Sequence, residues 1–130
     1  MNAPRRTLGA AALVLLLGCL DSTAPVAGPL KVDLTTPNSG LDGAAVVVLS
    51  GPVAPGSVTA AAGLTLWGGP VTTATATIAL TGTLSTGTIL TLQVDDVKKV
   101  GQYHATLQQV AASSGFGLRL LSGYSLAVTK

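Results

Sequence analysis

The chain has 130 residues, enough for one domain, and only 9% of them are charged. Its formal net charge of +2 depends on Arg5 and Arg6, because without this pair the five remaining basic side chains equal the five acidic ones in number. Such a near-neutral surface lacks the basic patch with which proteins bind nucleic acid, so we expect no nucleic-acid partner. Aromatic residues are scarce at 3%, so the core must come from Val, Leu, Ile and Ala.

Residues 1–18 have the pattern of a secretory signal peptide. The basic pair is followed by an uncharged apolar run over residues 8–17, and a basic start before roughly 7 to 15 apolar residues is typical of secretion signals. The run is shorter than the about 20 residues of a membrane-spanning helix. The residues after the arginines match a twin-arginine signal poorly, which favours the general secretory route. A buried helix of a cytosolic domain is the alternative, but residues 21–29 offer it nothing to pack on.

The apolar run ends in Leu16-Leu17-Gly18-Cys19, which resembles the bacterial lipobox. In that motif the thiol accepts a diacylglycerol as a thioether, and a protease cuts after the small residue. The resemblance implies that Cys19 becomes an N-terminus carrying a diacylglycerol and an N-acyl lipid. As the only cysteine in the chain, Cys19 cannot form an intramolecular disulfide, and lipidation accounts for the lone thiol better than an ordinary apolar role does.

The lipid would act as a membrane anchor, because each buried CH₂ contributes about 0.8 kcal/mol and two or three acyl chains together hold stably. In Gram-negative lipoproteins, an Asp directly after the lipidated cysteine favours retention in the inner membrane. Here that position is Leu20, and Asp21 comes one residue later. The resemblance therefore implies an outer-membrane lipoprotein of the cell envelope, facing the periplasm or the surface.

Residues 19–29 comprise the lipidated cysteine and a small, proline-containing stretch without periodicity, which predicts a flexible tether. A domain over residues 30–130 follows. It opens with a period of two, in which Leu30, Val32 and Leu34 share an apolar face. A turn-rich segment over 37–43 then precedes a continuous apolar run over 44–50 that suits a central strand. Short strands are predicted over 57–61 and 64–67.

The second half of the domain continues the alternation. Residues 71–80 place threonines on one face and Ala, Ile and Leu on the other, and Gly82 and Gly87 are expected to bracket the next turn. Three further strands are predicted from their inward residues, which are Leu90, Leu92 and Val94, then Tyr103, Ala105 and Leu107, then Tyr124, Leu126 and Val128. A short helical turn is an alternative for residues 108–121. The pattern predicts an all-β fold, a two-sheet antiparallel β-sandwich that is Ig-like or cohesin-like.

The opening alternating strand, the turn-rich gap, the strand over 44–49 and the Gly-marked final strand are similar in outline to cohesins. The resemblance covers residues 30–130 and implies an architecture. It assigns no binding residue.

Few residues suit catalysis or metal binding. His104 is the only histidine, it lies on the polar face of a predicted strand, and no Gly-x-Ser-x-Gly motif occurs. Asp95 and Asp96, or Asn38 with Asp42, could offer oxygen ligands to calcium, but the spaced Asp pattern of a calcium loop is absent. Neighbouring strand carboxylates also point to opposite faces, which disfavours a glycosidase pair. We therefore expect no catalytic residue, no metal and no cofactor apart from the covalent lipid.

Two aromatic residues are candidates for ligand contact. Trp67 precedes two glycines, and an exposed Trp can stack on a sugar, although packing in the core or at a sheet edge is the favoured alternative. Phe116 lies between Gly115 and Gly117 in a long loop, either as a partner-binding tip or as part of a loop that plugs the end of the sandwich.

These features favour a non-enzymatic, membrane-anchored module that binds a protein or another envelope partner. A carbohydrate-binding or adhesion module is the alternative, and it requires an exposed Trp67 beside polar groups. A small hydrolase would require a cleft that joins His104 to an acid and a serine.

Overall fold

The computed structural model describes residues 23–68 and 71–130, and the leader and the lipobox-like motif lie outside these ranges. The described residues form eight strands and one 3-10 helix. In chain order they are β1 (Gly28–Thr35), β2 (Asp42–Ser50), β3 (Ser57–Ala60), β4 (Leu64–Trp67), β5 (Thr75–Leu84), β6 (Gly87–Val94), η1 (Val97–Gln102), β7 (His104–Ala112) and β8 (Ser125–Thr129).

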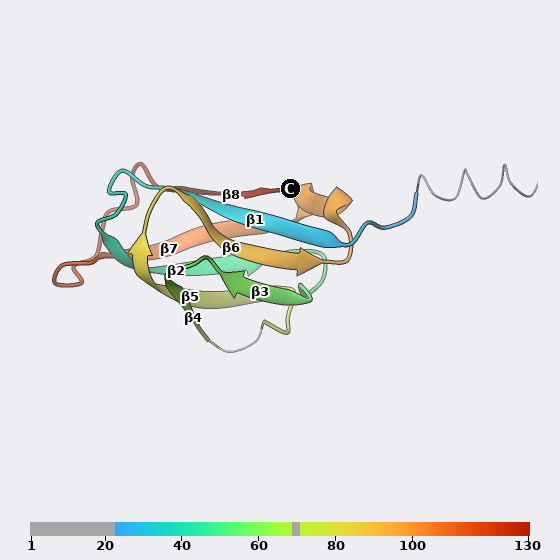
Figure 1. The fold of residues 1–130 in the computed structure, drawn as a ribbon, viewed down its shortest axis with the longest axis horizontal. Coiled ribbons are helices and arrows are strands. Elements are labelled where there is room, and N and C mark those ends of the chain that lie inside the picture. The colour runs from blue at the N-terminus through green and yellow to red at the C-terminus, as the bar shows by residue number, and fades with distance from the viewer. Residues whose placement is uncertain (1–22, 69–70) are drawn as a thin grey trace, which may run out of the picture.

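The strands form two four-stranded antiparallel sheets that pack face to face (Figure 1). Sheet A has the order β3-β6-β1-β8, and sheet B has the order β4-β5-β2-β7. The two-sheet antiparallel sandwich predicted from the alternation is confirmed. The run over 44–50 is the central strand that the sequence predicts, since β2 pairs with both β5 and β7.

The core lies between the sheets and is made of aliphatic side chains that alternate along each strand. In β2 the buried apolar side chains are Ala45, Val47 and Leu49, and the residues between them are half-exposed. The same period buries the inward residues of the other long strands, including Leu30, Val32, Leu34, Ile78, Leu80, Leu90, Leu92 and Val94. Because inward and outward residues alternate, each sheet keeps a separate outer face.

Two boundaries differ from the prediction. β5 continues through Gly82 to Leu84, so the turn expected from Gly82 shrinks to the two residues before β6. A register shift between Asp42 and Ala44 accommodates this extension, with Gly82 at a φ of +128°. β1 begins at Gly28, which pairs with Val94, so the domain begins two residues before the predicted residue 30.

The 3-10 helix lies outside residues 108–121, the segment for which a short helical turn was the alternative. β7 continues to Ala112, and the helical residues form η1, directly after β6. Asp96 caps η1, because its carboxylate accepts the backbone N–H of Lys98 at 3.1 Å. Aspartate is a favoured residue at this position since its side chain satisfies an N–H that has no partner within the helix.

The described end of the predicted tether is attached to η1. The carboxylate of Asp96 accepts the N–H of Val26 at 3.3 Å, and the carbonyl of Val26 accepts the N–H of Val97 at 2.8 Å. The ammonium of Lys98 donates to the carbonyl of Ala24 at 2.6 Å. The chain thus enters beside η1, at the end of the sandwich opposite the β1–β2 and β7–β8 loops (Figure 1). Within the described residues, no helix has the length and hydropathy to cross a membrane.

Candidate ligand-binding face

The outer face of sheet B is uncharged. Its outward residues are Thr65 and Trp67 in β4, Thr75, Thr77, Ala79, Thr81 and Thr83 in β5, Ala44, Val46, Val48 and Ser50 in β2, and His104, Thr106, Gln108, Gln109 and Ala111 in β7. In contrast, Lys31 and Asp33 lie on the outer face of sheet A, where Asp33 accepts hydrogen bonds from two threonines. We refer to the outward residues of sheet B as the sheet B outer face.

Trp67 lies on this face, at the edge strand β4. It pairs with Ala79, and its indole Nε1 donates diagonally to the hydroxyl of Thr81 at 2.8 Å. The side chain remains 57% exposed. Trp67 therefore lies on an edge strand. Its ring is open to solvent, and its indole Nε1 is already hydrogen-bonded.

Phe116 is also exposed. It has a φ of +54°, which only a minority of residues other than glycine adopt, and it is 68% exposed. The loop around it folds back along the free edge of β7. The N–H of Ala112 donates to the carbonyl of Gly117 at 2.9 Å, and Ala111 forms a bridge with Leu118.

The folded-back loop brings Phe116 to the same face as Trp67. Phe116 borders a hollow of about 320 Å³ whose other lining residues are Gly43, Thr81, Gly82, Thr83 and Ser113. Thr81 therefore lines this hollow and also accepts the hydrogen bond of Trp67. The structure thus brings together the two aromatic residues that the sequence singles out, with Thr81 between them.

Hydroxyl groups around the hollow remain able to bond a ligand. Thr81 uses its oxygen as an acceptor for the indole, so its own proton is available. Ser113 donates to the carbonyl of Leu41 at 3.0 Å, so its oxygen can accept. Thr83 is exposed, and its hydroxyl has no hydrogen-bond partner among residues 23–68 and 71–130. The hollow therefore combines an aromatic wall with neutral donors and acceptors.

A buried polar network holds the loops beside this face. The carboxylate of Asp42, with no exposed surface, accepts hydrogen bonds from Thr36 at 2.7 Å, from Tyr124 at 3.0 Å and from Arg119 at 3.1 Å. Asn38 donates to the hydroxyl of Tyr124 at 2.9 Å. Asn38 and Asp42, considered above as calcium ligands, both belong to this network. Its signal in the sequence was an Arg and a Tyr in a loop otherwise made of Ser, Gly, Leu and Phe.

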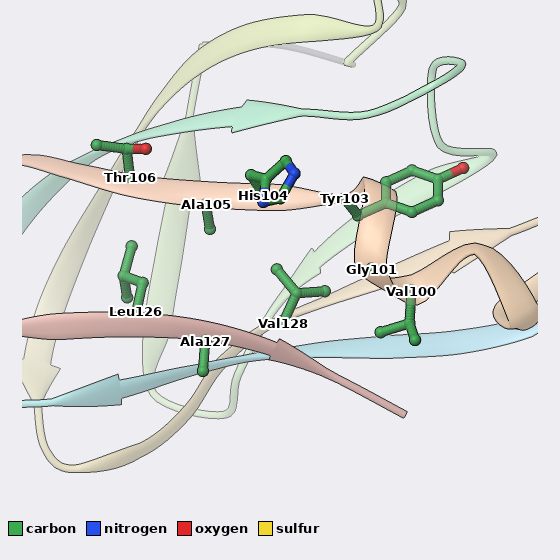
Figure 2. Close-up of a pocket in the computed structure, with 9 residues that line it drawn as sticks. All are labelled: Val100, Gly101, Tyr103, His104, Ala105, Thr106, Leu126, Ala127 and Val128. Carbon is green, nitrogen blue, oxygen red and sulfur yellow. The ribbon is translucent and has the colours of Figure 1, made fainter.

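A larger hollow, of about 500 Å³, lies between the edge strands β7 and β8 and includes His104. In Figure 2 His104 and Thr106 lie on the same side of β7, while Leu126 and Val128 extend from β8 toward it. Within the described residues, the His104 ring makes no hydrogen bond to a serine or an acid, and no group of three or more His, Cys, Asp or Glu could hold a metal ion. The hydrolase hypothesis gains no support from this geometry.

Asp95 and Asp96, which the sequence offered as calcium ligands, follow the end of β6. Their charges act on the side chain of Tyr103. Burial raises the pKa of the Tyr103 hydroxyl, and the negative charges of these two carboxylates raise it further.

No protein-family model, curated protein or solved structure matches this chain. The cohesin resemblance stays a prediction.

Proposed function

We propose that this chain is a lipid-anchored protein of the cell envelope whose β-sandwich is a non-enzymatic binding module, with the sheet B outer face as the contact surface. The observation that carries the binding role is the placement of Trp67 and Phe116. These residues are distant in sequence, yet both are exposed on one uncharged face and share Thr81 as a neighbour. Exposed apolar patches mark interaction sites, and aromatic side chains are enriched at such sites.

The anchor is supported by the lipobox-like Leu16-Leu17-Gly18-Cys19 after a basic and apolar leader. The described chain enters the sandwich beside η1, and the loop that carries Phe116 lies at the opposite end (Figure 1). A lipid at Cys19 would hold the domain by its η1 end, so the Phe116 loop would be directed away from the attachment point. This orientation supports a role in contacting another envelope component.

The non-enzymatic assignment is supported by what the grouped polar side chains do. Asp42, Arg119 and Tyr124 satisfy one another beneath the surface, which is typical of a structural network. The His104 imidazole on the sheet B outer face makes no hydrogen bond to a serine or an acid within the described residues, and the other exposed polar groups of this face are hydroxyls, amides and the indole of Trp67. Such groups bind and orient a ligand, and they offer no acid and base for proton transfer.

The anchor is tested with the full chain and a Cys19→Ala variant, expressed in a Gram-negative host. We expect the wild-type chain to partition into the detergent phase and to carry the mass of a diacylglycerol and an N-acyl group. Cys19→Ala should lose the acyl mass and leave the membrane fraction, whereas the control Ser22→Ala should behave as the wild type. A Cys19→Ala protein that still carries acyl mass would overturn the anchor.

The binding surface is tested by capture from an envelope extract with the full chain in detergent. We expect the wild type to retain a component that Trp67→Ala and Phe116→Ala no longer retain. Val53 is similarly exposed, at 49%, in the β2–β3 loop, so Val53→Ala serves as the control and should retain it. If both aromatic variants keep every component that the wild type keeps, this face is not the contact surface.

A further inference from the structure

We propose that the sheet B outer face binds a neutral glycan, with Trp67 and Phe116 stacking on sugar rings on either side of Thr81. This inference rests on the proposed function, because it uses the same face and names the chemical class of its partner. The exposure of Trp67 beside Thr81 meets the condition that the sequence set for a carbohydrate-binding module.

The charge of the face indicates a neutral ligand. The strands of sheet B present no Asp, Glu, Lys or Arg outward along their described lengths. The nearest cation by chain position to Phe116 is Arg119, and its Nε lies 3.1 Å from the buried carboxylate of Asp42. Its charge is therefore compensated inside the protein. An anionic polymer would meet no Lys or Arg among the outward residues of sheet B. A neutral polyol needs no such cation to bind.

The two aromatic rings suit the apolar faces of sugars. A pyranose presents C–H groups on its faces, and these carry a small positive charge that is attracted to the negative face of an aromatic ring. The bond from Trp67 to Thr81 fixes the tilt of the indole before any ligand arrives. Phe116 is held by a loop that is hydrogen-bonded back to β7. Rings that are ordered in advance lose less conformational entropy on binding.

The hollow beside Phe116 suits the hydroxyl edge of a sugar. Thr81 and Thr83 flank the bulged Gly82 of β5, and both line the hollow. With Ser113 they supply neutral donors and acceptors around a space of about 320 Å³. Gly43 lets Ser113 pack closely against β2 at the edge of this space, since a Cβ built there would lie 2.7 Å from the Cα of Ser113. Apolar walls with a few fixed polar groups are typical of small-molecule sites.

The chain offers its own reporter, because Trp67 is its only tryptophan. The full chain in detergent micelles is titrated with neutral hexasaccharides of glucose, xylose and mannose, with polygalacturonate as an anionic polymer, and with phosphatidylcholine vesicles. Trp67 emission is followed throughout, and calorimetry repeats each titration for variants that lack the indole. The variants are Trp67→Ala, Phe116→Ala and Thr83→Val. Val53→Ala and the sheet A outer-face substitution Thr59→Val are the controls.

We expect at least one neutral hexasaccharide to change Trp67 emission saturably. Phe116→Ala should weaken that binding about tenfold through the lost stacking, and Thr83→Val should weaken it about threefold through the lost hydroxyl. Both controls should bind as the wild type does. Polygalacturonate should bind more weakly than the neutral glycan.

Three results would overturn the proposal: no neutral glycan gives a fluorescence or calorimetric response, Phe116→Ala binds as tightly as the wild type, or only the anionic polymer or the vesicles bind. Envelope capture tests the proposed function separately from the glycan. If envelope capture is lost in Trp67→Ala and Phe116→Ala while every glycan is silent, the partner is a protein, and the binding face stands without the glycan. If capture is also unaffected by these substitutions, both proposals fall.

Discussion

The Nε of Arg119 lies 3.1 Å from the Oδ1 of Asp42, a carboxylate with no exposed surface at the start of β2. The same carboxylate accepts a hydrogen bond from the hydroxyl of Tyr124, so one buried group joins β2 to the middle and the end of the β7–β8 loop. This loop carries Phe116 and borders the hollow on the sheet B outer face. The shape of the candidate site therefore depends on an ion pair that no ligand needs to touch.

Asp42→Ala should destabilise the protein strongly. Removing one partner of a buried pair leaves the others without compensation, and we expect a loss of about 3 kcal/mol in the free energy of unfolding. Urea unfolding followed by circular dichroism measures it. Asp33→Asn is the control, because its hydrogen bonds lie at the surface of sheet A and surface bonds of this kind contribute under about 1 kcal/mol. Equal losses for both variants would contradict the structural role of Asp42.

Thr81→Val should free the indole of Trp67 without unfolding the domain. The variant removes the acceptor of the Nε1 bond, so acrylamide should quench the fluorescence more efficiently, while the free energy of unfolding falls by about 1 kcal/mol or less. Thr77→Val provides a matched control, because Thr77 lies on the same face of β5 and makes no bond to the indole. Identical quenching in wild type, Thr81→Val and Thr77→Val would contradict the fixed indole.

Gly82→Ala should cost more than an ordinary surface substitution. Gly82 has a φ of +128°, and an added Cβ would collide with the carbonyl oxygen of Gly63. Substituting alanine at such a backbone conformation destabilises by more than about 1 kcal/mol. Gly101 is the comparison, because a Cβ there meets nothing within 4 Å, and Gly101→Ala should be nearly neutral. Thermal unfolding of the two variants separates these outcomes.

The carboxyl of Asp96 should titrate below its ordinary value. Desolvation acts to raise the pKa of Asp96, but the backbone N–H groups of Val26 and Lys98 and the positive charges of two lysines outweigh it, so the pKa lies below 3.8. Because the folded pKa is depressed, the stabilising contribution is present above the unfolded pKa and is lost as the pH falls through the folded one. Carbon-detected NMR of the side-chain carboxyl measures the midpoint. A midpoint at or above 3.8 would show that the cap on η1 is absent in solution.

The period-two pattern predicted the strands because burial on one face is a local property of the sequence. It placed the inward residues of β1 and β6 correctly, and those predicted for β8 are half-buried against the core. It could not anticipate that β5 runs through Gly82, because a glycine that usually marks a turn is accommodated here by a bulge against β2. η1 was missed because its six residues carry no buried side chain and thus no apolar period.

The sequence identified residues of the candidate site but not their arrangement. Trp67 and Phe116 stood out as aromatics beside glycines, but their common face depends on the pairing of β4 with β5 and on the loop that folds back along β7. Both are contacts between distant segments, which local patterns do not encode. Asp42 was visible as an acid in a turn, and its partners, 77 and 82 residues away, were not.

The bonds between η1 and residues 24 and 26 also set how far the domain can stand from a bilayer. The predicted spacer of residues 19–29 would reach up to about 37 Å if every residue were free to extend. Because Lys98 holds the carbonyl of Ala24 and Asp96 holds Val26, at most five residue steps separate Cys19 from the attached chain, or about 18 Å at full extension. A lipid on Cys19 would therefore keep η1, with Lys98 and Lys99, close to the headgroup layer. The link between lipid and domain would be short, so the sandwich would reorient about its η1 end near the membrane surface.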